Sequence, residues 1–162
     1  MSELTQQQVQ SLFDYRDGKL FWKENRARGK IKAGNEAGGL TTKGYKRLMI
    51  GYKEYPTHKI VYLWHFGKYP ELIDHINNDP LDNRIENLRE ATYLTNMYNR
   101  RKGSNNKSGC KNVSWNSKNK VWQIHIHSNK KVRCWYVKDF ELAELIAHEA
   151  RSLYHGKFAN HV

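Results

Sequence analysis

Short apolar runs separated by glycine limit what this chain can fold into. In the first 57 residues the runs KLFWK, YKRLMI and KEYPT are divided by Asp-Gly and Gly-Gly pairs, which favour turns. The last third contains KNVSWN, KVWQIHIHS and KVRCWYV. The middle run of these alternates apolar and polar residues, as a half-buried strand does. We therefore expect short strands in the N-terminal part and a three-stranded antiparallel sheet in the last third.

Helices are predicted between these groups of strands. The segment THKIVYLWHFG predicts a helix with Thr57 as its N-cap and Gly67 at its end. A second helix is expected to start after Thr92, and a third to start after Asp139 and end at Gly156. Together the elements predict an α+β fold.

A polar, glycine-bearing segment near residue 103 predicts a linker between two modules. We expect a first module at 1–102, a linker at 103–110 and a three-stranded sheet with a helix at 111–162. Modules of about 50 to 60 residues can just bury a sufficient core.

The charge of the chain favours a polyanionic partner such as nucleic acid. Lys and Arg number 28 against 16 acids, which gives a formal charge of +12 and a pI near 9.7. No Asp or Glu occurs between Ala91 and Lys138. The cations of this basic block are Arg100, Arg101, Lys102, Lys107, Lys111, Lys118, Lys120, Lys130, Lys131, Arg133 and Lys138. The plain alternative is a basic protein whose charge only keeps it in solution.

Other classes of protein are not supported by the sequence. The N-terminus lacks the basic start and apolar core of a signal peptide, and no window approaches the ~20 apolar residues of a membrane span. Cys110 and Cys134 belong to no CxxC pair, so a structural zinc site is not expected. We expect a cytoplasmic protein without membrane contact.

The segment from Glu71 to Glu90 is acidic and rich in asparagine, unlike the basic block that follows it. Its pair Asp74 and His75 has the residue types that phosphodiester hydrolysis needs, namely a ligand for a cation and a base that activates water. Adjacent residues of a strand point to opposite faces, so the two side chains can serve both purposes at once. Asn96, from the following helix, would supply a second oxygen ligand, and Asn87 would pin the loop that orients His75. Such ligands suit Mg²⁺, or Mn²⁺ in its place.

With these residues the segment resembles the HNH endonucleases, whose ββα-metal motif carries Asp-His, a central Asn and a final His or Asn. The flanking HKIVYLWHFGKYP and DNRIENLREAT resemble phage-borne and homing members of that family. The resemblance implies a motif centred on 70–102, in which His75 is the general base, Asp74 and Asn96 bind the divalent metal, and Asn87 braces the loop.

Two alternatives stay open within this resemblance. Asn99 takes the role of Asn96 if the helix register differs by a turn, and Asn83 is the rival of Asn87. The final position is an asparagine where many members have histidine, which makes a zinc-preferring site less expected.

Residues 107–161 resemble the sheet and helix of plant ethylene-response-factor DNA-binding domains, in which the sheet enters the major groove. The resemblance rests on SGCKNVSWNSKNKVWQIHI, KVRCWYV and YHGKFA. The exposed sheet face is predicted to present Lys111, Ser114, Asn116, Lys118, Gln123, His125, His127, Lys131 and Arg133. Arg100, Arg101, Lys102 and Lys107 precede it as further DNA contacts. Ser114, Asn116 and His127 stand where that family has arginines, so we expect looser base readout.

These observations predict a divalent-metal-dependent endonuclease of phage or homing type that cuts duplex DNA, in the bacterial host cytoplasm if a phage encodes it. No long amphipathic seam predicts a dimer, so we expect a monomer or a weak homodimer. The alternatives are a DNA-binding regulator without nuclease activity and an RNA-binding protein.

Overall fold

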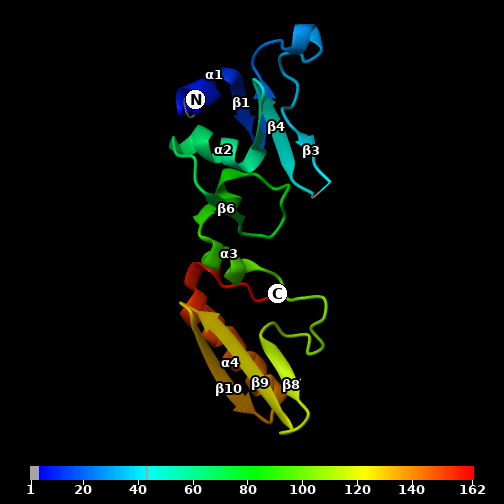
Figure 1. The fold of residues 1–162 in the computed structure, drawn as a ribbon, viewed down its shortest axis with the longest axis vertical. Helices are drawn as coiled ribbons and strands as arrows, with labels where there is room; N and C mark the ends of the chain where they lie inside the picture. Colours follow the sequence, from blue (N-terminus) through cyan, green and yellow to red (C-terminus); the bar gives the residue numbers. More distant parts are fainter. Residues whose placement is uncertain (1–3, 43) are drawn as a thin grey trace. The chain divides into compact units, whose positions relative to one another are not determined.

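Two units make up the chain, Met1–Thr92 and Tyr93–Val162, in a computed structural model that describes residues 4–42 and 44–162. Both units combine short helices with small antiparallel sheets. The predicted α+β class is therefore confirmed, and Figure 1 shows its elements.

Over residues 4–42 and 44–92, the first unit contains three small sheets and two α-helices. Its elements are α1 (Gln6–Leu12), β1 (Phe13–Arg16), β2 (Lys19–Trp22), η1 (Ala27–Gly29), β3 (Gly39–Leu40), β4 (Lys46–Ile50), β5 (Lys53–Pro56), α2 (Thr57–Phe66), β6 (Leu72–His75), η2 (Ile85–Asn87) and β7 (Leu88–Ala91). The hairpins β1–β2 and β6–β7 and the meander β3–β4–β5 are all antiparallel.

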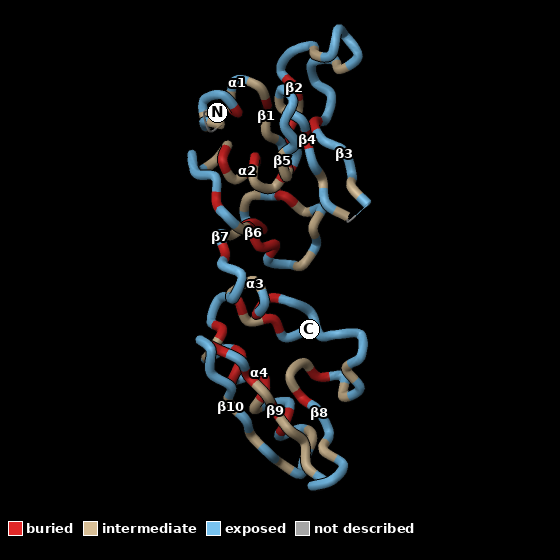
Figure 2. The backbone as a smooth tube through the Cα atoms, viewed as in Figure 1, coloured by how far each residue is buried: buried red, intermediate tan, exposed pale blue. Residues whose placement is uncertain are grey.

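Apolar side chains from these elements form one core. In Figure 2 the backbone of every buried residue is coloured red, and the core residues are among them. Phe13, Leu20, Ile60 and Val61 have no exposed surface. Ile73 of β6 belongs to the same cluster. Because Ile73 is buried, the residues that follow it in β6 are fixed to the body of the unit.

The ends of α2 differ in how well the sequence predicted them. The helix ends at Gly67, whose φ of 65° is the left-handed conformation that glycine adopts most easily. Its N-cap is Pro56, and no side chain caps it, so the prediction of Thr57 as the N-cap was wrong. The helix α1 was not predicted, although its capping box of Thr5 and Gln8 is visible in the sequence.

The second unit is a three-stranded sheet covered by one long helix. Its elements are α3 (Tyr93–Asn99), β8 (Val113–Asn116), β9 (Val121–Ser128), β10 (Lys131–Val137), α4 (Phe140–His155) and η3 (Gly156–Phe158). The strands lie in the order β10–β9–β8, and α4 packs on one face of this sheet (Figure 1). Asp139 caps α4 by accepting a hydrogen bond from the backbone N–H of Leu142 at 2.7 Å, as predicted.

The segment predicted as a linker, 103–110, belongs to the second unit. The hydroxyl of Ser108 donates to the carbonyl of Val113 at 2.7 Å, and the side-chain amide of Asn106 donates to the carbonyl of Cys110 at 2.9 Å. Cys110 itself is part of the core of the unit. The segment is therefore folded against the sheet it precedes.

Candidate active site

Asp74 and His75 are the last two residues of β6, and both side chains are buried. In the antiparallel pair with β7, Asp74 lies opposite Arg89 and His75 lies opposite Leu88. The exposed fractions are 5% for Asp74 and 8% for His75, so little water reaches either group. Burial of two polar side chains at the end of one short strand is costly unless each has a partner.

Arg89 is the partner of Asp74. Its Nε and Nη2 atoms lie 2.8 Å and 2.6 Å from the same carboxylate oxygen, Oδ2. Two charge-assisted contacts fix the direction of the carboxylate. Arg89 was not predicted from the sequence, because its contact with Asp74 depends on the register between β6 and β7.

Asn83 is the partner of His75. The Nε2 atom of His75 lies 2.9 Å from Oδ1 of Asn83, whose side chain is 2% exposed. With the amide oxygen as acceptor, the neutral imidazole carries its proton on Nε2, and Nδ1 holds the basic lone pair. Asn83 therefore contacts the predicted base directly.

His58, on α2, lies edge-on to His75 with the ring centroids 5.2 Å apart. Burial, and secondarily the positive charge of nearby groups that include His75, lowers the pKa of His58 to about 3. His58 is therefore a neutral ring at physiological pH. Tyr45, in the connection between β3 and β4, lies near both imidazoles. Its ring centroid is 6.0 Å from that of His58 and 6.3 Å from that of His75.

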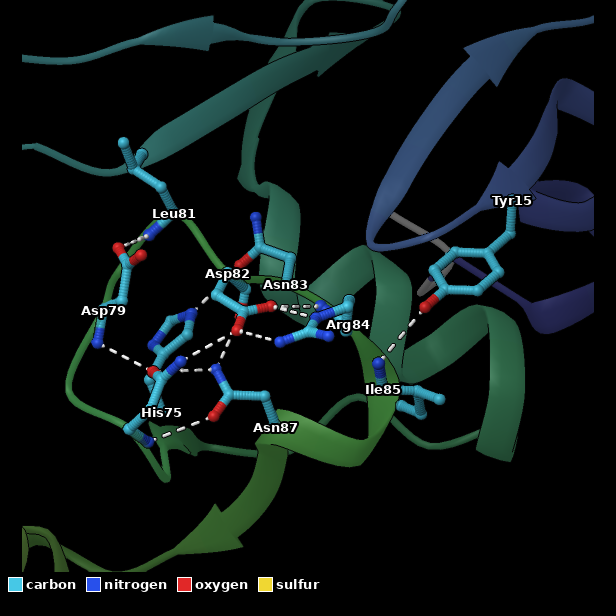
Figure 3. Close-up of polar contacts among 10 residues, drawn as sticks. Tyr15, His75, Asp79, Leu81, Asp82, Asn83, Arg84, Ile85 and Asn87 are labelled. Atoms are coloured by element: carbon cyan, nitrogen blue, oxygen red, sulfur yellow. Dashed lines mark hydrogen bonds and ion pairs between the residues drawn. The ribbon is translucent and has the colours of Figure 1, made fainter.

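Asn87 holds the loop that connects β6 to β7, as Figure 3 shows. Its Oδ1 accepts the backbone N–H of Asn77 at 3.0 Å, and its Nδ2 donates to Oδ1 of Asn77 at 3.0 Å and to the carbonyl of Asp82 at 2.7 Å. Asn87 is the last residue of the short 3-10 helix η2. All of its contacts cross the loop, so Asn87 closes it and Asn83 orients the imidazole.

An ion pair further stiffens this loop. Arg84 donates from Nε to Oδ1 of Asp82 at 2.9 Å and from Nη2 to Oδ2 at 2.8 Å. The hydrogen bond from Arg84 lowers the pKa of Asp82 to about 2.

The β1–β2 hairpin supports the same loop from the other side. The hydroxyl of Tyr15 accepts the backbone N–H of Ile85 at 3.1 Å (Figure 3). Gly18, with φ of +79°, lies so close to the loop that a Cβ there would be 2.7 Å from the backbone nitrogen of Arg84 and 2.9 Å from the carbonyl carbon of Asn83. The N-terminal hairpin therefore helps to set the position of Asn83, which touches His75.

Asn96, the other predicted metal ligand, is a partly exposed residue of α3 in the second unit. Asn99, the alternative, is 3% exposed, and its carbonyl accepts the side-chain amide of Asn160 at 2.7 Å. The ring of Tyr98 stacks on His155 with 4.0 Å between centroids. These contacts attach α3 to the C-terminal unit. The joint role of Asp74 and Asn96 stays a prediction.

The sheet of the second unit has one face away from α4. Val113, Ile124 and Ile126 are in the core under the helix, so the alternate residues of β8 and β9 face the opposite way. By the pairing of the strands, this open face carries Ser114, Asn116, Gln123, His125 and His127, together with Val132, Cys134 and Tyr136 of β10. The five polar residues predicted on β8 and β9 are thus brought together. Lys118 is exposed in the turn between these two strands.

Two residues predicted on that face lie elsewhere. Arg133 is paired with the buried Ile126 and places its guanidinium 4.0 Å from the ring centroid of Tyr154 on α4. The ammonium of Lys111 donates to the carbonyl of Tyr98 at 2.8 Å, and burial lowers the pKa of Lys111 to about 8. The prediction that these two cations face outward from the sheet was therefore wrong.

Lys131 pairs with the buried Ser128 and so starts on the helix side of the sheet, although it is exposed at the end of the strand. Arg100, Arg101, Lys102 and Lys107 are exposed in the loop before β8. Their predicted contact with DNA stays a prediction.

The donors at this site suit a hard cation. Among the residues that the structure describes, no three His, Cys, Asp or Glu side chains come together as a cation site. A cation would instead combine the carboxylate of Asp74 with neutral oxygen ligands, water or substrate phosphate. Mg²⁺ is commonly held in this way, by one or two carboxylates and substrate oxygens.

Comparisons with known proteins bear on the same segment. A family model described as HNH endonuclease matches residues 55–98, which contain Asp74, His75, Asn87 and Asn96. Protein 3.8 of Escherichia phage T7 is 33% identical over 89 residues, which are 54% of this chain and 72% of that protein. No solved structure matches the chain. Within the described ranges, no helix has the length and apolar character needed to cross a membrane.

Proposed function

This chain belongs to the family of Protein 3.8 of Escherichia phage T7 and carries an HNH endonuclease domain at residues 55–98, and on this premise we propose that it hydrolyses phosphodiester bonds of duplex DNA with a divalent cation. The observation that carries the proposal is the arrangement of His75. Its imidazole is buried at the end of β6, oriented by Asn83, and adjacent in sequence to a carboxylate that Arg89 holds in place.

In the proposed reaction, His75 takes a proton from the attacking water. The contact from Asn83 fixes the ring tautomer, so the basic nitrogen is defined before the substrate arrives. General-base catalysis of this kind contributes roughly 10² to 10⁴ in rate. Asn87 does not contact the reacting groups in this proposal. It acts on His75 indirectly, because it closes the loop that carries Asn83.

Asp74 and Asn96 are the residues that would hold the cation, which we propose is Mg²⁺ or Mn²⁺. When bound, the cation neutralises charge on the phosphate and on the departing 3′-oxygen. Asp74 supports this role because it is a buried carboxylate whose orientation is already fixed. Arg89 then acts as a positioning residue that holds the carboxylate of Asp74 in one orientation.

DNA binding is proposed for the second unit. The open face of β8–β10 presents amides, hydroxyls and imidazoles, which can donate to and accept from base edges in the major groove. The exposed cations Arg100, Arg101, Lys102, Lys107 and Lys118 would contact phosphates. We propose that the protein acts on DNA in the bacterial host cytoplasm, as a monomer or a weak homodimer.

A supercoiled-plasmid assay tests the proposal. Purified protein is incubated with Mg²⁺, with Mn²⁺ or with a chelator, and the nicked and linear products are followed in time. We expect metal-dependent product, with nicked circles before linear molecules because one centre cuts one strand at a time. No cleavage with any cation, together with tight and salt-sensitive DNA binding, would favour the DNA-binding regulator instead.

A further inference from the structure

The first unit contains a basic loop that the active site does not use. The loop, residues 25–33, lies between β2 and β3 and extends beyond the end of β4 in Figure 1. It carries Arg26, Arg28, Lys30 and Lys32 and no acidic residue. Figure 2 shows that nearly all of it is exposed.

Among the residues that the structure describes, these four cations differ from most others of the first unit in having no carboxylate partner. Elsewhere in residues 4–42 and 44–92 the ion pairs are Arg16 and Lys23 with Asp14, Lys19 and Lys46 with Glu36, Arg47 with Glu54, Lys68 with Glu90, Arg84 with Asp82, and Arg89 with Asp74. In the described part of this unit, the loop therefore carries four of the six cations without an ion pair, and Lys53 and Lys59 are the other two.

Backbone hydrogen bonds give the loop a defined shape. Arg26 and Ile31 exchange N–H···O bonds of 2.8 Å and 3.1 Å, and the backbone N–H of Ala33 donates to Oδ1 of Asn25 at 2.9 Å. At the base, Trp22 donates to the carbonyl of Asn35 at 3.0 Å. The cations are thus carried on a closed loop.

The tip of the loop is strained and its first arginine is oriented. Ala27 and Arg28 have φ of 52° and 54°, a left-handed conformation that costs L-residues roughly 1–2 kcal/mol each. The guanidinium of Arg26 lies 4.7 Å from the ring centroid of Trp22. Ile31 is the apolar side chain of the loop that packs against the core of the unit. Strain of this kind is typical of binding segments.

We infer that loop 25–33 is a second DNA contact, which binds the phosphate backbone of the duplex outside the segment that is cut. The inference rests on the proposed function for its choice of duplex DNA as the polyanion. Arg28, Lys30 and Lys32 are exposed and unpaired, so each can neutralise a phosphate without breaking an interaction in the free protein. Arg26, partly buried against Trp22, holds the tip in place.

Charge-matched variants of the full chain test the inference. The loop variant combines Arg28→Gln, Lys30→Gln and Lys32→Gln. The control variant combines Lys19→Gln, Lys53→Gln and Lys68→Gln, so it loses the same charge from other exposed positions. Binding of a fluorescent duplex is measured by anisotropy in chelator across a series of salt concentrations, so no cleavage intervenes. Circular dichroism checks that both proteins are folded.

Each phosphate contact contributes about 0.9 to the slope of log K against log salt, so three contacts contribute about 2.7. Between about 50 and 200 mM salt, wild-type affinity is then expected to fall about 40-fold more than that of the loop variant. The control variant is expected to keep a slope within about one contact of wild type.

Three results would overturn the inference: a loop variant with wild-type slope and affinity, a control variant that loses as much as the loop variant, or a loss seen with duplex RNA but not with duplex DNA. Because cleavage is not measured, the test is separate from the nuclease proposal. A protein that cuts nothing but loses DNA binding with the loop cations would leave the inference standing and remove the proposed function.

Discussion

Replacing Arg89 with methionine removes the cation that compensates the buried carboxylate of Asp74. The two side chains are 13% and 5% exposed, and both contacts are shorter than 3 Å. Loss of one partner of such a pair costs about 3–5 kcal/mol, whereas an exposed pair contributes about 0–1 kcal/mol. We expect Arg89→Met to lower the unfolding free energy by about 3 kcal/mol.

Urea denaturation measures this change, with Arg16→Met as the matched control. Arg16 pairs with Asp14 at 3.8 Å in a solvent-exposed setting, so its removal should cost less than about 1 kcal/mol. The double variant Asp74→Asn with Arg89→Met should recover part of the loss, because no uncompensated charge remains. A loss below about 1 kcal/mol for Arg89→Met would refute the buried pair.

The same variant tests Asp74 as a metal ligand without measuring cleavage. A cation that binds Asp74 replaces the missing positive charge, so Mn²⁺ should stabilise Arg89→Met more than wild type. At a concentration near 100 times Kd the gain would be about 2.7 kcal/mol. An Mn²⁺ effect that persists in the double variant would place the cation elsewhere.

Three further predictions concern other parts of the chain. The pKa of His58 is about 3 in the fold and 6.5 in the unfolded chain, so the unfolded state gains the proton first as pH falls and stability drops by about 2 kcal/mol from pH 6.5 to 5. Urea melts at several pH values should show a smaller loss of unfolding free energy toward pH 5 for His58→Gln than for wild type. An equal loss in the two proteins would contradict the lowered pKa of His58. Gly18→Ala should slow cleavage by displacing the 83–84 backbone, whereas Gly34→Ala, also left-handed but with nothing within 4 Å, should not. Equal cleavage rates for the two glycine variants would contradict the claim that Gly18 sets the position of the 83–84 backbone. Truncation of 103–162 should abolish cleavage as well as weaken binding. The helix α3 carries the proposed ligand Asn96, and it packs within the second unit, most of which the truncation removes. Wild-type turnover by the truncated protein would show that α3 does not need residues 103–162 for its role in cleavage.

The sequence predicted the elements well where local signals were strong. The runs KLFWK, YKRLMI and KVWQIHIHS are strands, Gly67 and Gly156 end their helices, and Asp139 caps α4. Each of these follows from a turn residue, a cap or an alternation within a few positions. The Asp-His pair was also predicted to lie on a strand, and it forms the end of β6.

The remaining features depend on contacts between distant segments. Asn83 and His58 meet His75 from a loop and a helix, which no spacing in the sequence reveals. The faces of β10 were ambiguous because both alternations contain apolar residues, Val132 and Tyr136 on one side and Trp135 and Val137 on the other. Arg133 was therefore assigned to the wrong face.

The most direct test of the account is the single-turnover rate of duplex cleavage by His75→Ala and by wild type, at protein concentrations that saturate the DNA in both cases. The account predicts a loss of about 10² to 10⁴ in rate with an unchanged dissociation constant. A His75→Ala protein that cuts at the wild-type rate, or that loses binding as much as cleavage, would contradict the claim that this buried imidazole is the base.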